Sequence, residues 1–156
     1  EWSADACARL IYGWFKAYPG VKAFMDDEVA YLKRHGYCYD MWGRRTYLPE
    51  IHSSFESSRE AASRKAVNQD IQGGAQGIIK QAMVDMWPQV QEWRDTGMVY
   101  PLLQIHDELL FDIDEGELDN TIPLIQYYME NAVTLSIPTP VEAKVGVRWG
   151  EMKKWG

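Results

Sequence analysis

Three consecutive residues, His106, Asp107 and Glu108, place an imidazole and two carboxylates at one point of the chain. Apolar runs over residues 98–105 and 109–113 flank them, which predicts two strands joined by a turn at the triplet. Such a hairpin would hold all three side chains at its tip. Charged groups in an apolar context need a partner or an ion. A metal, a phosphate or a substrate at the tip would account for the triplet, and an acidic turn in solvent accounts for it equally well.

Length and composition predict one folded domain with a hydrophobic core. The chain has 156 residues, 46% of them hydrophobic, with seven Trp and nine Tyr, which argues against a disordered segment. Its formal net charge is −7, so any contact with nucleic acid must come from a local basic patch. Cys7 and Cys38 lack metal-ligand spacing and are expected to be reduced. We find no signal-peptide or membrane-spanning pattern, and expect a cytoplasmic protein.

The residues between 36 and 51 predict a second, shorter hairpin. Aromatic and β-branched residues lie on both sides of Trp42 and Gly43, which suit a tight turn. Arg44 and Arg45 follow at the return of this hairpin. Adjacent arginines can bind phosphate, although a solvated turn would contain them equally well.

Residues 54–93 are predicted to be helical, in two pieces. On a continuous helix Arg64, Asn68 and Gln72 fall at positions i, i+4 and i+8, and therefore on one face. Amide and guanidinium groups donate to the N3 and O2 acceptors of the DNA minor groove, which every base pair presents. This face could sense base-pair shape without reading sequence. From the spacing alone, a solvated helix face is the favoured alternative.

The remaining elements are predicted from apolar periodicity and from capping and turn residues, and we expect them to pack the core without forming a site. They are a helix over residues 4–18 capped by Ser3, a helix over residues 21–35 ended by Gly36, a helix that starts after the turn at residues 114–118 and runs to about residue 133, and a strand over residues 141–147 that closes a sheet beside the hairpin.

Three motifs resemble A-family DNA polymerases of the bacterial polymerase I type. Residues 104–111 resemble the last catalytic motif of that family, a hydrophobic strand that ends in Gln-Val-His-Asp-Glu. Residues 42–49 resemble Phe-Gly-Arg-Arg-Arg-Tyr-Leu-Pro, and residues 64–80 resemble the helix motif Arg-x-x-x-Asn-x-x-x-Gln-Gly-Thr-Ala-Ala-Asp-Ile-Ile-Lys. The closing residues 141–149 resemble the final strand of the family. The resemblance covers nearly the whole chain, in the order of the family.

The chain departs from the helix motif at three positions. Gly74, Gln76 and Gly77 stand where the family usually has Thr, Ala and Asp. Glycine in a helix costs roughly 1 kcal/mol relative to alanine. We therefore expect a loosened helix near residues 73–77.

The resemblance implies an α+β fold, the C-terminal palm-and-fingers portion of a polymerase right hand. Helices would pack on a small antiparallel sheet that carries the catalytic β-hairpin. Residues 1–97 would form a helical segment on the fingers side, with the short hairpin near residues 37–51 and the DNA-facing helix near residues 56–94. Residues 98–156 would form the palm segment, with the catalytic hairpin, a helix and the closing strand.

The resemblance also implies a role for each candidate residue. Asp107 would be a ligand of Mg²⁺ in a two-ion site, and Glu108 a weaker or outer ligand. His106 would lie beside the primer terminus. The remaining DNA contacts would be Arg64, Asn68 and Gln72 in the minor groove, Arg59 on template phosphate, and Arg44 and Arg45 on DNA phosphate.

The first metal-binding Asp of the family and its nucleotide-holding fingers helix would lie upstream of Glu1. Two ions must be held from both sides, so we expect the chain alone to be inactive. An upstream fragment would supply the remaining palm, fingers and thumb. This partner would arise from a split gene, a split intein or cleavage, and the pair would act on primer-template DNA and a deoxynucleoside triphosphate (dNTP) in a bacterial or phage-infected cell.

Two alternatives come from other functional classes. One is a catalytically silent subunit that clamps DNA or supports assembly. The other is a small independent phosphohydrolase, for which His35 and His52 are the only further histidines and make a poor ligand set.

Overall fold

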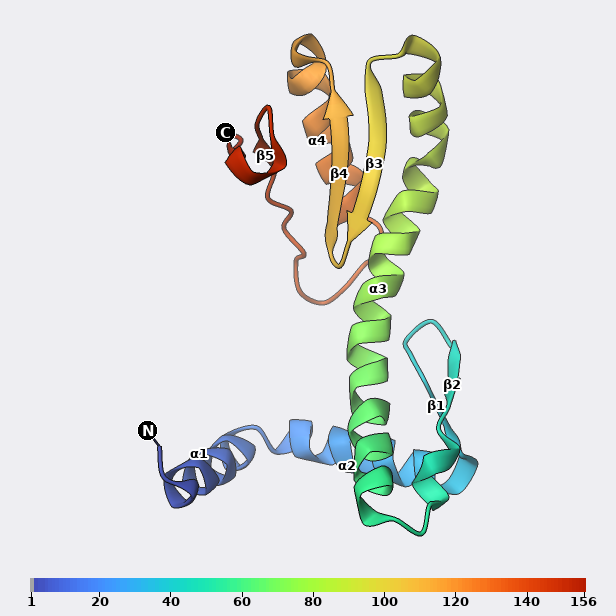
Figure 1. Cartoon of the computed structure of the whole chain (residues 1–156), viewed down its shortest axis with the longest axis vertical. Coiled ribbons are helices and arrows are strands. Elements are labelled where there is room, and N and C mark those ends of the chain that lie inside the picture. Colours follow the sequence, from blue (N-terminus) through green and yellow to red (C-terminus); the bar gives the residue numbers. More distant parts are fainter. Residues whose placement is uncertain (1) are drawn as a thin grey trace. The chain divides into compact units, whose positions relative to one another are not determined.

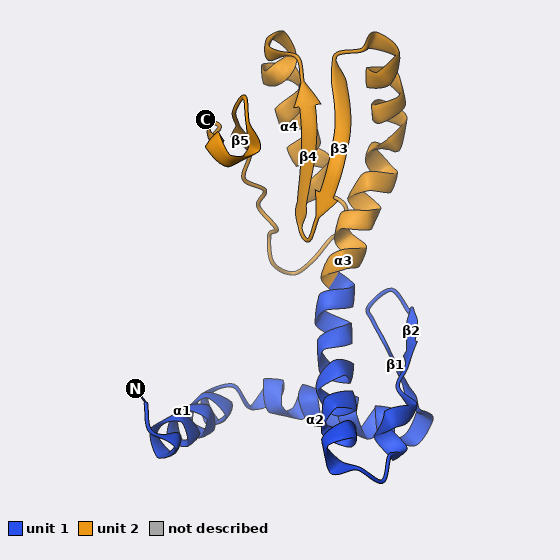
Figure 2. Cartoon of the chain, in the orientation of Figure 1, with its two compact units in different colours: residues 1–74 blue, residues 75–156 orange. Residues whose placement is uncertain are grey.

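The computed structural model describes residues 2–156 (Figure 1). The chain consists of two compact units, residues 1–74 and residues 75–156 (Figure 2). Their boundary falls inside the long helix α3, Glu56–Thr96. The expected boundary after residue 97 separates a fingers-side segment from a palm segment, and this division stays a prediction.

The first two helices are capped as predicted, but they bury little. The Ser3 hydroxyl accepts a hydrogen bond from the Ala6 N–H at 3.2 Å, and Gly36 ends the second helix with φ 74. No residue of the first helix is buried, so the expectation that it packs a core is wrong. The second helix buries only Leu32, since few other elements of unit 1 cover its apolar side. These helices are α1, Ala4–Ala17, and α2, Pro19–His35.

The core of unit 1 joins α2, the short hairpin and the first turns of α3. The hairpin is antiparallel, as predicted, and pairs Cys38 with Thr46. Cys38 points inward, where its buried thiol belongs to the same cluster as Leu32. The strands are β1, Tyr37–Tyr39, and β2, Arg45–Tyr47, followed by the 3₁₀ helix η1, Pro49–His52. The other buried members of the cluster are Leu48, Ile51, Ala62 and Ala66.

Helix α3 is a single helix of 41 residues, and the prediction of two pieces with a loosened part at residues 73–77 is wrong. Pro88 lies inside it without ending it. A side chain on Gly73 would place its Cβ 2.7 Å from Gln69 Nε2, and one on Gly74 would lie 3.1 Å from Met41 Sδ. The glycines thus allow the turn of the short hairpin to approach the helix closely, and this packing holds a segment that propensity alone would loosen.

In unit 2, a hairpin packs against α4 and the C-terminal half of α3. Met86, Val90 and Ile125 form its buried centre, with Trp93 and Phe111 among the half-buried residues around them. The elements are β3, Val99–Ile105, β4, Glu108–Ile113, the 3₁₀ helix η2, Glu115–Glu117, and α4, Leu118–Glu130.

The two strands of this hairpin differ in burial. Leu109, Leu110 and Phe111 of β4 are half-buried. In β3 only Val99 is buried, and Leu102 and Leu103 are 53% and 54% exposed. The rest of β3 is therefore largely exposed, because no described element of unit 2 covers its apolar side chains.

The C-terminal residues form a small sheet of their own. β5, Lys144–Val145, pairs antiparallel with β6, Lys153–Lys154, around the 3₁₀ helix η3, Trp149–Glu151. The expected strand over residues 141–147 is thus shorter, and it does not pair with the hairpin β3–β4. Among residues 2–156 no helix is both long and apolar enough to cross a membrane.

Candidate functional site

The tip of hairpin β3–β4 is a two-residue loop made by His106 and Asp107. Ile105 pairs with Glu108, so Glu108 is the first residue of β4 rather than part of the turn. His106 has φ 52, a left-handed conformation in which His is found more often than bulkier residues. The Gln104 amide donates to the His106 carbonyl at 2.7 Å and closes the loop. The sequence therefore folds into a tight turn that projects the Asp107 carboxylate.

The three predicted catalytic side chains are all exposed. His106, Asp107 and Glu108 form no side-chain hydrogen bond or ion pair with any of residues 2–156. Solvent reaches these charges, so the apolar runs beside them do not force them to find a partner within the chain. Their polar atoms remain free for an external ligand.

The tip fits part of a Mg²⁺ site. Carboxylate oxygens of Asp107 and Glu108 are the hard donors that Mg²⁺ prefers, and Mg²⁺ is commonly held by one or two carboxylates together with water and substrate phosphates. Within the described residues no group of three His, Cys, Asp or Glu side chains is placed to hold a metal ion. The tip can supply one side of a metal centre.

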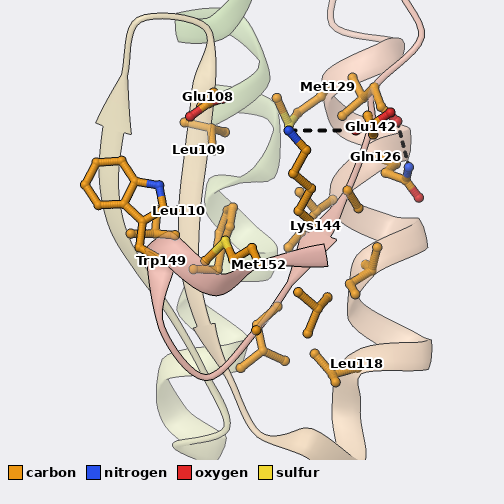
Figure 3. Close-up of a pocket in the computed structure, with 18 of the residues that line it drawn as sticks. Glu108, Leu109, Leu110, Leu118, Gln126, Met129, Glu142, Lys144, Trp149 and Met152 are labelled. Atoms are coloured by element: carbon orange, nitrogen blue, oxygen red, sulfur yellow. Dashed lines mark hydrogen bonds and ion pairs between the residues drawn. The ribbon is translucent and has the colours of Figure 1, made fainter. Parts of the chain in front are cut away.

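A cavity of about 630 Å³ opens beside the tip, within unit 2. It lies between β4, α4 and residues 140–152, with Glu108 at one end and Leu118 at the other (Figure 3). Its walls include the half-buried side chains Leu109 and Leu110 of β4. Gln126 donates to the Val141 carbonyl at 2.8 Å and fixes the C-terminal segment on the far side of the cavity.

Unit 1 contains the predicted DNA-facing residues. Arg64, Asn68 and Gln72 are exposed and share one face of the continuous helix α3. Arg64 lies 3.7 Å from Glu60, but both side chains are largely exposed, so this pair holds the guanidinium only weakly. All three side chains are available for a ligand.

Two of the predicted phosphate-binding arginines already have partners. Arg59 donates to the carbonyls of Ser53 and Ser54 at 2.8 and 3.0 Å, and so fixes the segment that leads into α3. Arg44 donates to the carboxylate of Asp40 and to the Gly73 carbonyl at 2.6 Å. These hydrogen bonds lie within the protein, and the contacts of Arg44 and Arg59 with DNA stay predictions.

Arg45 differs from Arg44 in having no carboxylate partner among residues 2–156. Its guanidinium lies 4.9 Å from the centre of the Tyr37 ring. Its predicted contact with DNA phosphate also stays a prediction.

Sequence reasoning missed Asp40, which organises the turn of the short hairpin. Its buried carboxylate accepts from the N–H groups of Trp42 and Arg44 at 3.0 and 3.1 Å, and from Arg44 Nε at 2.7 Å. Burial raises the pKa of Asp40, but these hydrogen bonds and the charge of Arg44 outweigh it and lower the pKa below its usual range. The available signal was an Asp three residues before Gly43, because Asp side chains commonly bond to the backbone of their own turn.

A sequence profile described as DNA polymerase family A matches residues 1–151. DNA polymerase I of Geobacillus stearothermophilus is 39% identical over 146 residues, which cover 94% of this chain and 16% of that protein. DNA polymerase I of Pseudomonas aeruginosa is 40% identical over 141 residues, which cover 88% of this chain and 15% of that protein. The chain belongs to DNA polymerase family A.

The solved structures agree with this assignment. The polymerase domain of Pol1 from M. smegmatis, in complex with DNA primer-template and dNTP, matches with a TM-score of 0.77 and 39% identity. The match covers 87% of this chain and 24% of that chain. The expected family and α+β fold are therefore confirmed. The chain spans about one sixth of the length of the two curated relatives.

Proposed function

We propose that the chain is the C-terminal part of a template-directed DNA polymerase, which adds a nucleotide to a primer 3′ end by a two-metal mechanism. The observation that carries this proposal is the hairpin tip, where Asp107 and Glu108 are exposed and unpaired in a chain of DNA polymerase family A. An upstream segment or a separate chain would supply the remaining palm, fingers and thumb.

Each residue at the tip then has its own task. Bound Mg²⁺ supplies charge stabilisation at the attacking 3′ oxygen and at the leaving pyrophosphate. Asp107 holds the ion from the end of the loop. Glu108, which begins β4 outside the loop, takes the lesser share. His106 lies beside the primer terminus.

The exposed triplet on α3 would follow the primer-template duplex. Arg64, Asn68 and Gln72 present donors at one-turn intervals, which suits the acceptors that every base pair presents in the minor groove. Hydrogen bonds of this kind depend on base-pair geometry. They would respond to a mismatch without selecting a sequence.

The cavity beside the tip supports the need for an upstream segment. The β4 side chains Leu109 and Leu110 remain half-buried along its wall. An apolar segment placed there would bury them and gain about 25 cal/mol for each Å² of apolar surface removed from water. The same segment could bring a second carboxylate near Asp107.

The test is a chimera in which this chain replaces the matching segment of Geobacillus stearothermophilus DNA polymerase I. We expect Mg²⁺-dependent extension of a labelled primer by the chimera, and none by this chain alone or by the relative without its matching segment. Asp107→Asn should abolish extension, whereas Asp95→Asn, a change of an exposed carboxylate at the end of α3, should not. Extension that survives Asp107→Asn would refute the proposal.

A catalytically silent DNA-clamping or assembly subunit is the second candidate. The incomplete set of metal ligands within residues 2–156 is the observation that favours it. A chimera that binds primer-template DNA but does not extend it would select this candidate.

A further inference from the structure

Unit 1 has an exposed aromatic surface that the proposed catalytic and minor-groove sites do not use. Side chains alternate along a strand, so the residues that flank the inward-pointing Cys38 and its partner Thr46 all face outward. Two aromatic side chains of α2 extend the same surface. We call it the Tyr–Arg face, and its members are Tyr31, His35, Tyr37, Tyr39, Arg45 and Tyr47.

The side chains of the Tyr–Arg face hold one another in place. Tyr31 donates from its hydroxyl to the Tyr37 hydroxyl at 3.1 Å and stacks on His35 with ring centres 3.9 Å apart. Tyr31 and Tyr39 pack edge to face, with ring centres 5.1 Å apart. Arg45 lies 4.9 Å from the Tyr37 ring centre. A ligand would therefore meet rings that are already ordered.

The outer part of the face is open to a ligand. Tyr47 is 67% exposed and Tyr39 is 43% exposed. Arg45 is exposed, and no carboxylate within residues 2–156 pairs with it. An arginine side chain stays protonated in proteins, so Arg45 keeps its positive charge. In a chain of net charge −7, this surface combines aromatic rings with an unpaired cation.

We propose that the Tyr–Arg face is a stacking platform for single-stranded DNA, with unpaired bases on Tyr39 and Tyr47 and a phosphate at Arg45. Bases of any sequence stack on aromatic rings, and arginine neutralises the backbone beside them. An apolar protein partner would bury the tyrosine hydroxyls and the guanidinium without satisfying them, whereas a single strand can satisfy both. The identity of the strand as unpaired template rests on the proposed polymerase function, but the binding itself does not.

The experiment measures fluorescence anisotropy of a labelled oligothymidylate titrated with the full chain. We expect a dissociation constant on the order of 10⁻⁴ to 10⁻⁶ M at physiological salt. A strand of equal length without bases, and a blunt duplex, should bind more weakly. Equal binding of the strand with bases and the strand without them would overturn the proposal.

Three substitutions separate stacking from charge. Tyr47→Ala should weaken binding about fivefold or more, and Tyr47→Phe should retain it because the ring remains. Arg45→Ala should reduce the slope of log affinity against log salt by about 0.7, whereas Tyr47→Ala should leave this slope unchanged. The matched control is Tyr12→Ala, which removes a ring that is 72% exposed on α1. Equal affinities of the Tyr47→Ala and Tyr12→Ala chains would overturn the proposal.

Crosslinking locates the bound strand directly. An oligonucleotide that contains 5-iodouracil is irradiated with the full chain, and the modified peptide is identified by mass spectrometry. Crosslinks within residues 37–47 support the proposal, and crosslinks confined to other residues contradict it. Loss of these crosslinks in the chimera would mean that the upstream protein segment covers the Tyr–Arg face, and it would also contradict the proposal.

Failure of this inference and failure of the proposed function give different results. If the chimera extends primers but Tyr47→Ala does not change the binding of the chain to single-stranded DNA, only the proposed role of the Tyr–Arg face is refuted. A chain that loses binding with Tyr47→Ala, beside a chimera that does not extend primers, refutes only the polymerase function.

Discussion

The hairpins β1–β2 and β3–β4 each carry an aspartate at the turn, and the two side chains have opposite environments. The Asp40 side chain is 0% exposed and accepts three hydrogen bonds from Trp42 and Arg44. Asp107 is exposed and forms no hydrogen bond or ion pair within residues 2–156. Asp40 uses its charge to hold the fold together, and Asp107 keeps its charge for a ligand.

The difference arises from what lies next to each turn. Gly73 and Gly74 let the first turn approach α3, where Trp42 donates to the Gly74 carbonyl at 3.0 Å and Arg44 donates to the Gly73 carbonyl at 2.6 Å. The second turn has only two residues, and no described side chain donates to Asp107. A charged residue in a turn therefore becomes a candidate for chemistry only when its own fold leaves it unsatisfied.

The largest expected effect is on catalysis, at the second turn. In the chimera, Asp107→Ala should slow single-turnover primer extension by about three orders of magnitude or more, equivalent to roughly 4 kcal/mol of transition-state stabilisation. Glu108→Ala should be milder, because Glu108 begins β4 outside the loop and takes the lesser share of the ion in the proposed site. DNA binding should persist in both variants. Extension near the parent rate in Asp107→Ala would make the two hairpins alike, both structural.

The next effect is on stability, at the first turn. Asp40→Ala should lower the free energy of unfolding in urea by about 2–3 kcal/mol, because hydrogen bonds to a buried charged group are lost. The control is Asp26→Ala, whose exposed pair with Lys22 should contribute less than about 1 kcal/mol. Asp107→Ala should change stability by no more than about 0.5 kcal/mol. Equal losses for Asp40→Ala and Asp107→Ala would remove the contrast.

The stabilising role of Asp40 should also depend on pH. Its pKa is lower in the folded chain than its ordinary value of 3.8. The stabilisation is therefore fully present above pH 3.8, and it is lost as the pH falls through the folded-state pKa. In Asp40→Asn, urea unfolding should show a shallower loss of stability below pH 3.8 than in the parent. A steeper loss in the variant would reverse the sign of this assignment.

A smaller effect is expected at the polar face of α3 next to the glycines. In the chimera, Asn68→Ala or Gln72→Ala should remove a hydrogen bond worth about 0.5–1.5 kcal/mol, and so slow extension by up to about tenfold. Matched and mismatched primer ends should be affected unequally. If both variants keep the parental ratio of matched to mismatched extension, Asn68 and Gln72 have no role in the minor groove.

The smallest effect concerns Glu28, a carboxylate that contrasts with Asp40. Its side chain is partly buried, but no group within residues 2–156 donates a hydrogen bond to it. Burial, and then the charges of Asp70 and Asp27, raise the pKa of Glu28 above its ordinary value of 4.5. Its contribution to stability is therefore present below pH 4.5 and lost as the pH rises through the folded-state pKa. Glu28→Gln should raise the free energy of unfolding at neutral pH by less than about 1 kcal/mol, and a loss of stability there would contradict this.

Local sequence determined the features that depend on a few neighbouring residues. Ser3 and Gly36 cap their helices as predicted, since each acts on backbone groups within one turn. The His106–Asp107 loop follows from two apolar runs with only these residues to turn on. The family assignment also came from motif order, because residues 42–49, 64–80 and 104–111 suffice to identify it.

Tertiary structure decided which of these residues are buried, paired or free. Propensity predicted a break near residues 73–77, but contacts from a hairpin some thirty residues earlier in the chain keep α3 continuous. The apolar stripe of α1 predicted a packed helix, and no described element buries it. Asp40 and Asp107 have the same side chain, but the turn of Asp40 supplies three donors and packs against Gly73 of α3, whereas the two-residue turn of Asp107 does neither. Burial depends on residues distant in the sequence, and local patterns do not contain that information.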